Sequence, residues 1–437
     1  MKDTGDLQAM MALAAPLVLS ELGWMAMGVV DTMFVGRVSA EAVGAVSLGT
    51  TVFYTIAMSS SGLLLGLDTL VAQAWGRRDA HDARLSLVNG IVLALLLTVP
   101  VVALVWLSIP LLHSAGESPA VILQAAPYIR ALLWSIPPLL VFFALRRYLQ
   151  SVGLARPILF ALVSANLLNI AGNWIFVYGN LGAPRLGAEG SGWATCISRV
   201  YMLAILVVAI WRGDHKIQRA DWRIDWQRIR QLIELGLPTA GQLVLETLVF
   251  GTVTLLVGRL SAVSLAGHQI ALTTVSMTFM MPLGISSAAA VLVGQAIGRG
   301  DVRGAAHSGW AALGFGAIGM SAAALVLVLF PRLIARVFTP DAAVIAAAVP
   351  LLRVAAFFQL FDGLQITATG ALRGSGHTHE PLWCHFAGYW VIGLPLGVLL
   401  CFGADWGAVG LWSGLLVGLI IIGSALFLYW RKIARRF

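Results

Sequence analysis

Long apolar runs, separated by short polar segments, recur along the whole 437-residue chain. Many of these runs approach or exceed about 20 residues, which is the length that an α-helix needs to cross a lipid bilayer. We therefore predict an all-α membrane protein with twelve transmembrane helices. The predicted helices lie near residues 10–35, 43–74, 86–110, 122–150, 157–178, 191–211, 236–258, 265–297, 308–331, 345–372, 381–402 and 406–430.

The composition agrees with this pattern. Hydrophobic residues make up 59% of the chain and charged residues only 11%, with a mean hydropathy of +0.88, whereas soluble proteins carry about 25% charged residues. The three cysteines have no metal-ligand spacing, and the cluster of His377, His379, Cys384 and His385 has no regular ligand spacing either. We expect no cofactor and no enzymatic activity, and the absence of a Walker A motif excludes ATP hydrolysis by this chain.

The positions of the cationic residues predict the orientation. An even number of helices places both termini on one side, and most of the 28 Lys and Arg lie at the termini or in loops on that side. By the positive-inside rule, both termini are cytoplasmic, which we assign to a bacterial inner membrane. The net charge of +8 then reflects topology and contact with anionic lipids. Because the charge is scattered over loops, we expect no nucleic-acid partner.

An internal repeat divides the chain into two similar halves. The segment VAQAWGRRD at residues 71–79 recurs as VGQAIGRGD at 293–301, and the same offset of 222 pairs Pro16 with Pro238. Six helices per half give both halves the same orientation, so we predict two pseudo-symmetric six-helix bundles. The predicted parts are an N-lobe, a cytoplasmic linker and a C-lobe at residues 1–211, 212–232 and 233–437.

The polar segment between the halves permits two interpretations. Trp222 and Trp226 fit an amphipathic segment on the lipid surface. A solvated linker that acts as a hinge fits the sequence equally well.

Asp31 is a carboxylate inside the first predicted helix, where a charge costs about 2.5–3.5 kcal/mol. Asn169 and Asn173 share one face of the fifth helix, and Asn173 lies at a similar depth to Asp31 at about 1.5 Å per residue. A carboxylate facing amide oxygens suits Na⁺, and a desolvated carboxyl suits a proton. The alternative is a hydrogen-bonded Asp31 that only fixes the first helix to the fifth.

Glu246 and Asp362 lie in the middle of the seventh and tenth helices. They are candidates for a second cation or proton site, or for the counter-charge of a cationic substrate. By the repeat, Asp31 aligns with Val253, so the duplication did not produce these carboxylates, which favours a functional role. Weaker candidates for the substrate cleft are Glu21, Trp24, Phe358 and Gln359.

Four segments together resemble the multidrug and toxic compound extrusion (MATE) family, in its NorM-like branch. They are VVDTMFVG at 29–36, VAQAWG at 71–76, NIAGNWIFVYG at 169–179 and ALRG at 371–374. The resemblance implies a V-shaped pair of six-helix bundles that exports organic cations and other drugs in exchange for H⁺ or Na⁺. Asp31 and Asn169 match family positions in the N-lobe, and Glu246 and Asp362 resemble the acidic pair of the C-lobe. Asn173 stands where another branch often carries an aspartate.

We therefore expect a secondary antiporter that exports amphipathic, mostly cationic compounds. Its expected partners are these small molecules and membrane lipids, its coupling ion is Na⁺ or H⁺, and we expect a monomer. One alternative is a lipid-linked oligosaccharide flippase of the same superfamily, which should line its cleft with basic residues, whereas the deep charges here are mostly acidic. A non-coupled channel is the other alternative.

Overall fold

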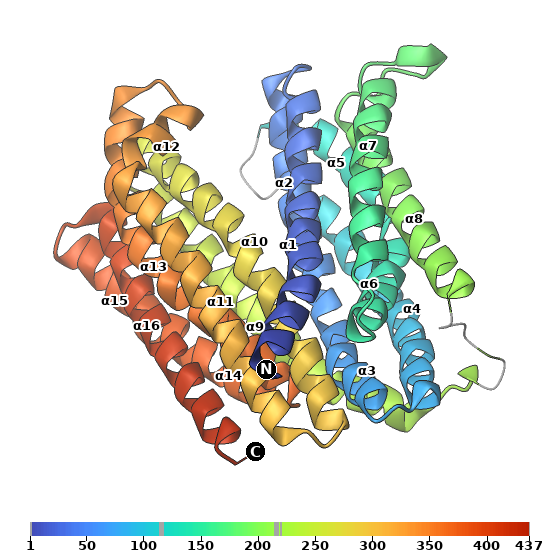
Figure 1. Cartoon of the computed structure of the whole chain (residues 1–437). Coiled ribbons are helices and arrows are strands. Elements are labelled where there is room, and N and C mark those ends of the chain that lie inside the picture. The colour runs from blue at the N-terminus through green and yellow to red at the C-terminus, as the bar shows by residue number, and fades with distance from the viewer. Residues whose placement is uncertain (1, 113–117, 214–217, 219–220, 437) are drawn as a thin grey trace. The chain divides into compact units, whose positions relative to one another are not determined.

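The computed structural model describes residues 2–112, 118–213, 218 and 221–436, and within them regular structure is helical throughout (Figure 1). The first half contains α1 (Lys2–Val35), α2 (Ala40–Ser61), α3 (Gly66–Gly76), α4 (Ala80–Leu111), α5 (Pro119–Leu133), α6 (Ile136–Ser151), α7 (Arg156–Phe176) and α8 (Ala188–Arg212). The second half contains α9 (Trp226–Gly258), α10 (Ala262–Gly298), α11 (Val302–Leu329), α12 (Pro331–Phe338), α13 (Ala342–Gly374), α14 (His379–His385), α15 (Leu394–Val398) and α16 (Gly407–Ala434).

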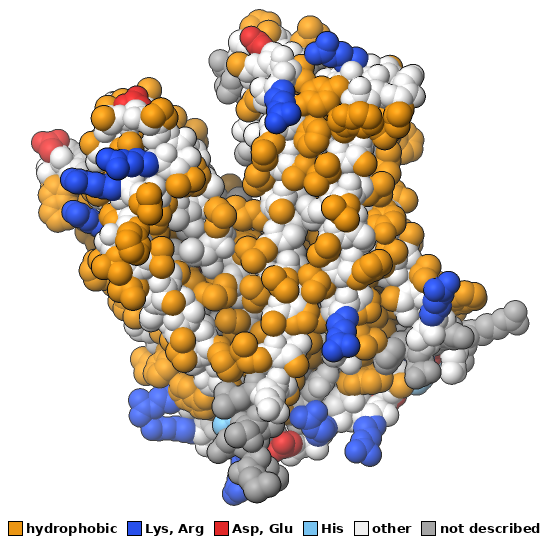
Figure 2. All heavy atoms as spheres, turned by 45° about the horizontal axis from the view of Figure 1, so that its top comes forward, with side chains coloured by type: hydrophobic (Ala, Val, Ile, Leu, Met, Phe, Trp, Pro, Cys, Tyr) orange, Lys and Arg blue, Asp and Glu red, His pale blue; other side chains and the backbone are white. Residues whose placement is uncertain are grey.

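These helices confirm the twelve predicted spans. Among the described residues, eleven helices are long and apolar enough to cross a membrane, and the pair of α5 and α6, bent by 50°, gives the twelfth when it is counted as one span. The sequence pattern did not predict this bend, nor the short helix α12. Hydrophobic side chains cover much of the face seen in Figure 2, and Lys and Arg gather near the helix ends. Such an apolar surface fits lipid contact.

Local structure repeats at the same offset as the sequence. Ser39 caps α2 by accepting a hydrogen bond from the Ala42 amide, and Ser261 caps α10 in the same way. Asp79 and Asp301, also 222 residues apart, cap α4 and α11. A capping side-chain oxygen satisfies a backbone N–H that the helix itself leaves without a partner. The two halves therefore begin equivalent helices with equivalent chemistry.

Contacts between residues group the chain into two compact units. One, here called the N-terminal unit, is Leu19–Ala240, and the other, the C-terminal unit, combines Met1–Val18 with Gly241–Phe437. The boundaries fall inside α1 and α9, so each of these helices contributes to both units. The division by repeat, into lobes at 1–211 and 233–437, remains a prediction.

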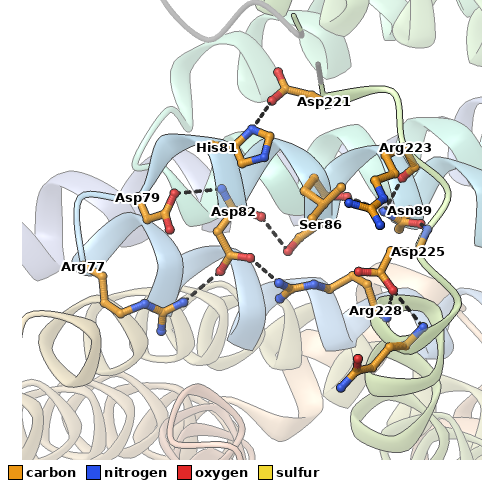
Figure 3. A network of polar contacts seen from close by, with 12 residues as sticks. Arg77, Asp79, His81, Asp82, Ser86, Asn89, Asp221, Arg223, Asp225 and Arg228 are labelled. Atoms are coloured by element: carbon orange, nitrogen blue, oxygen red, sulfur yellow. Dashed lines mark hydrogen bonds and ion pairs between the residues drawn. The ribbon is translucent and has the colours of Figure 1, made fainter. Parts of the chain in front are cut away.

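Part of the predicted linker is anchored to the start of α4, within the N-terminal unit (Figure 3). The side chain of Asp221 is fully buried and accepts hydrogen bonds from His81 Nδ1 and Arg84 Nε, both at 2.6 Å. The backbone N–H of Gln218 donates to the same carboxylate at 2.7 Å. Burial alone raises the pKa of Asp221, but these donors outweigh it, so its pKa lies below the ordinary value.

A second anchor lies two turns further along α4. Asn89 Oδ1 accepts from the backbone N–H of Asp225 at 2.8 Å, and Asn89 Nδ2 donates to the carbonyl of Arg223 at 3.1 Å. Trp222 and Trp226 remain 63% and 68% exposed. Neither interpretation of the linker predicted this anchoring, because both assumed that the segment makes no contacts with the rest of the protein. Residues 214–217 and 219–220 of the predicted linker lie outside the described residues.

The span His379–Gly403 in the C-terminal unit departs from regular α-helix. Two π-helical segments, Phe386–Gly393 and Leu399–Gly403, interrupt it, and π-helical turns often occur at functional sites. Glycines allow this span to pack closely on α16, since a Cβ atom on Gly414 would lie 2.2 Å from the backbone of Gly397. His385, the last residue of α14, directly precedes the first π-helical segment.

Candidate functional site

Asp31 lies four residues before the end of α1, and its side chain is buried at 5% exposure. Its Oδ1 accepts hydrogen bonds from Asn169 Nδ2 at 3.0 Å and from Asn173 Nδ2 at 2.7 Å. Its Oδ2 accepts from Thr195 Oγ1 at 2.7 Å. The structure therefore brings together the three residues that the depth argument had grouped. It adds Thr195 on α8, which the sequence analysis missed.

The orientation of the two amides differs from the sequence expectation. Their NH₂ groups, and not their oxygens, face the carboxylate, so Asp31 is held by neutral donors. Oδ1 of Asn173 is buried and has no hydrogen-bond partner in the described part of the chain. Carboxylate, amide and hydroxyl oxygens are the ligands that hard cations prefer. A half-turn of either amide would thus offer Na⁺ an oxygen ligand, whereas a proton needs only the carboxylate.

Arg199 is a second residue that sequence reasoning missed. It follows Thr195 by one helical turn on α8, is buried, and interacts electrostatically with Asp31. Its Nη1 donates to Ser135 Oγ at 2.6 Å, and its guanidinium lies 4.6 Å from the centre of the Phe53 ring. The sequence did contain a signal for Arg199, because a cationic residue inside a membrane span is as rare as an acidic one.

Glu21 and Trp24 lie one helical turn apart on α1. Glu21 forms a buried ion pair with Arg146 of α6, so a fixed cation already balances its charge. Trp24 stacks on Phe142, with ring centroids 6.3 Å apart. Arg146 lies near the end of α6, and its side chain is nevertheless buried. Deep charges in this unit are therefore of both signs, which corrects the description of them as mostly acidic.

Asp362 on α13 and Glu246 on α9 form the acidic pair of the C-terminal unit. Asp362 is buried, accepts a hydrogen bond from Gln365 Nε2 at 3.2 Å, and lies within electrostatic reach of Glu246. Two nearby carboxylates repel each other when both are ionised. A cation or a proton between them would relieve that repulsion.

A family model described as MatE matches residues 16–175 and 238–399. The chain belongs to the MatE family. The two matches begin 222 residues apart, which is the offset of the internal repeat. Membership agrees with the resemblance found in the sequence.

Individual relatives match over nearly the full chain. The chain is 38% identical to the probable multidrug resistance protein NorM of Mesorhizobium japonicum, over 98% of this chain and 94% of the relative. It is 34% identical to the multidrug resistance protein MdtK of Yersinia pseudotuberculosis, over 95% and 93%. The crystal structure of the eukaryotic MATE transporter AtDTX14 shares the fold, with a TM-score of 0.90, 21% identity, and coverage of 100% and 99%.

The remaining candidates of this MatE protein lie in packed surroundings. Phe358 is buried between Phe250 and Trp412, with ring centroids 6.1 and 6.0 Å away. Gln359 is buried and donates to Thr278 Oγ1 at 2.8 Å. Their contact with a substrate stays a prediction. Among the described residues, no group of three or more His, Cys, Asp and Glu is placed to hold a metal ion.

Proposed function

We propose that this protein exports amphipathic organic cations across a bacterial inner membrane by secondary antiport, in exchange for Na⁺ or H⁺, with both termini cytoplasmic. Family membership and the relatives named as multidrug resistance proteins support efflux. The observation that supports coupling of export to an ion is the environment of Asp31. This carboxyl is buried in a membrane span and is held by Asn169, Asn173 and Thr195. A carboxyl in this setting can change charge by binding an ion.

Competition between ion and drug is the proposed mechanism. Na⁺ or H⁺ at Asp31 neutralises the carboxylate, and an organic cation favours the conformation in which acidic groups are free. Two ligands that prefer different conformations exchange across a membrane without a direct contact between them. Asn169 and Asn173 hold the carboxylate in place, and Thr195 fixes its second oxygen.

Glu246 and Asp362 supply the second acidic site in this proposal. Their mutual repulsion favours binding of one positive charge, either the coupling ion or the head of the substrate. Glu21 takes a lesser part, because Arg146 already balances its charge.

Transport in proteoliposomes tests the proposal. The purified protein is reconstituted, Na⁺ and pH gradients are imposed separately, and the movement of an organic-cation dye is followed by fluorescence. We expect one of the two gradients to drive uphill movement of the dye. Movement that depends on neither gradient would contradict antiport and favour a channel. Failure to move any dye, with movement of a lipid-linked oligosaccharide, would favour the flippase alternative.

A further inference from the structure

His385 is a fully buried histidine of the C-terminal unit that the mechanism above does not use. Its Nδ1 lies 2.7 Å from the carbonyl oxygen of Pro381, one turn back on α14. Its Nε2 lies 2.8 Å from Oε1 of Gln365, whose Nε2 in turn donates to Asp362 at 3.2 Å. A carboxyl, an amide and an imidazole thus form one continuous chain, in which each of the three side chains is buried.

Hydrogen-bond chemistry restricts the protons that this chain can hold. A carbonyl oxygen only accepts, so Nδ1 of His385 carries a hydrogen. With the Gln365 oxygen facing Nε2, that nitrogen must also carry a hydrogen, which makes His385 an imidazolium beside an ionised Asp362. If the Gln365 amide turns by 180°, its NH₂ group donates to a neutral His385, and its oxygen requires a hydrogen from a protonated Asp362. Both arrangements contain one shared proton.

Loss of that proton leaves the chain unsatisfied. When Asp362 is ionised and His385 is neutral, both groups present lone pairs to Gln365. If the NH₂ group of Gln365 donates to one of these groups, its oxygen faces a lone pair of the other. Two acceptors in contact in a buried site cost free energy, because neither lone pair then has a donor. Gln242 Nε2 lies 3.3 Å from His385 Nε2, but a bond from it leaves the conflict at Gln365 unchanged.

We propose that Asp362, Gln365 and His385 form a single proton-binding unit, and that one organic cation at Asp362 replaces one proton of this unit. The inference deepens the proposed function, since it rests on export of a cation. When the cation pairs with Asp362, the O–H bond of the carboxyl or the Nε2–H bond of the imidazolium breaks, and the proton passes to water. The bound cation then supplies the positive charge that the proton supplied before, so the net charge of the unit together with its ligand is unchanged.

Other titratable groups surround this unit and are candidates for the same proton. Those on the elements that pack around His385 are Glu246 on α9, Tyr389 in the first π-helical segment, Tyr429 on α16, and His379, Glu380 and Cys384 on α14 itself. Among them, Glu246 and Tyr389 both interact electrostatically with Asp362. His379 is exposed at the first turn of α14 and serves as a matched control.

Proton release on binding of tetraphenylphosphonium tests the unit. The purified full-length protein is placed in sodium-free, weakly buffered solution at a series of pH values, and calorimetry and a pH indicator measure bound cation and released protons. We expect about one proton per cation in the wild type. A unit in which the proton can reside on either Asp362 or His385 binds that proton more tightly than either group alone. His385→Gln should therefore shift the pH of half-maximal release downward by about one unit, a tenfold change in proton affinity.

Gln365→Met, which keeps the side-chain volume, removes the hydrogen bond that Gln365 donates to Asp362 and should shift the pH of half-maximal release upward, whereas His379→Gln should leave the profile unchanged. Thermal unfolding and cation affinity verify that each variant is folded. Profiles of His385→Gln and Gln365→Met that coincide with the wild type would overturn the inference while leaving antiport intact. Dye transport driven by Na⁺ alone, without proton release, would overturn it as well. Absence of any gradient dependence in the wild type would instead reject the proposed function.

Discussion

The carboxyls of the two units are held by different chemistry. Asp31 accepts from Asn169, Asn173 and Thr195, and the nearby charge is Arg199, a guanidinium that does not lose its proton. Asp362 is linked through an amide to a histidine, which can gain or lose a proton. One duplicated scaffold therefore carries two sites that are not copies of each other.

This difference predicts a division of roles. The N-terminal site changes charge only when an ion or proton binds Asp31 itself. The C-terminal site has Glu246 near Asp362 and His385 at the end of its chain, so its charge can be redistributed among several groups. Loss of a single carboxylate should consequently be more severe in the N-terminal site.

The largest effect is expected for Asp31→Asn. The variant keeps the size of the side chain but removes the charge that responds to the coupling ion. Coupling free energies of 1–3 kcal/mol correspond to a loss of gradient-driven dye efflux of about 5-fold to 150-fold. Asp341→Asn is the control, because Asn also caps the helix start where Asp341 stands. Efflux by Asp31→Asn equal to that of the control would remove the N-terminal site from the mechanism.

Intermediate effects are expected for Glu246→Gln and Asp362→Asn. Each should lower efflux by about 3-fold to 10-fold, because the other carboxyl remains, and the double variant should lose more than the product of the two losses. The measurement is the initial rate of dye efflux from proteoliposomes under each gradient. A single C-terminal variant as impaired as Asp31→Asn would mean that the two sites contribute equally, contrary to the comparison above.

Much of this architecture could be predicted from the sequence, because long apolar runs and an exact internal offset can be recognised without knowledge of the tertiary structure. The grouping of Asp31 with Asn169 and Asn173 also followed, since depth along a helix is set by residue count. Thr195 and Arg199 escaped because the face that α8 turns toward Asp31 depends on packing. The orientation of the amides depends on neighbours that no local pattern specifies.

His385 shows a different limit. Its sequence neighbours suggested a metal cluster, which lacked ligand spacing, whereas its actual partners, Gln365 and Gln242, lie 20 and 143 residues away in the chain. Arg146 likewise looked like a helix-end cation and is a buried partner of Glu21. In both cases the decisive contact joins helices that are distant in sequence.

A smaller effect is expected for Thr195→Val, which has nearly the same shape but lacks the hydroxyl. One oxygen of Asp31 then loses its donor inside the protein, which costs about 1–3 kcal/mol of stability. Efflux should fall by about 2-fold to 5-fold, because the charge that couples transport is still present. Thermal unfolding and dye efflux are measured side by side, with Thr55→Val as a control on the exposed side of α2. Unchanged stability would show that Asp31 does not depend on this hydroxyl.

The smallest effect on efflux is expected for Asp221→Asn, a buried carboxylate outside the membrane spans. Its role in the structure is to anchor the linker to His81 and Arg84, so efflux should stay within about two-fold of the wild type, while stability falls by about 1.5–3 kcal/mol, as expected for hydrogen bonds to a charged group.

The pH dependence of that difference follows from the lowered pKa of Asp221. A lowered pKa gives stability that is complete above the unfolded value of about 3.9 and is lost as the pH falls through the folded pKa. The difference in unfolding free energy between the wild type and Asp221→Asn should therefore disappear in strong acid, below the folded pKa of Asp221. His81→Gln, which removes one exposed partner, should cost less than half as much. If Asp221→Asn instead abolished efflux as Asp31→Asn is expected to do, anchoring of the linker would itself belong to the transport cycle.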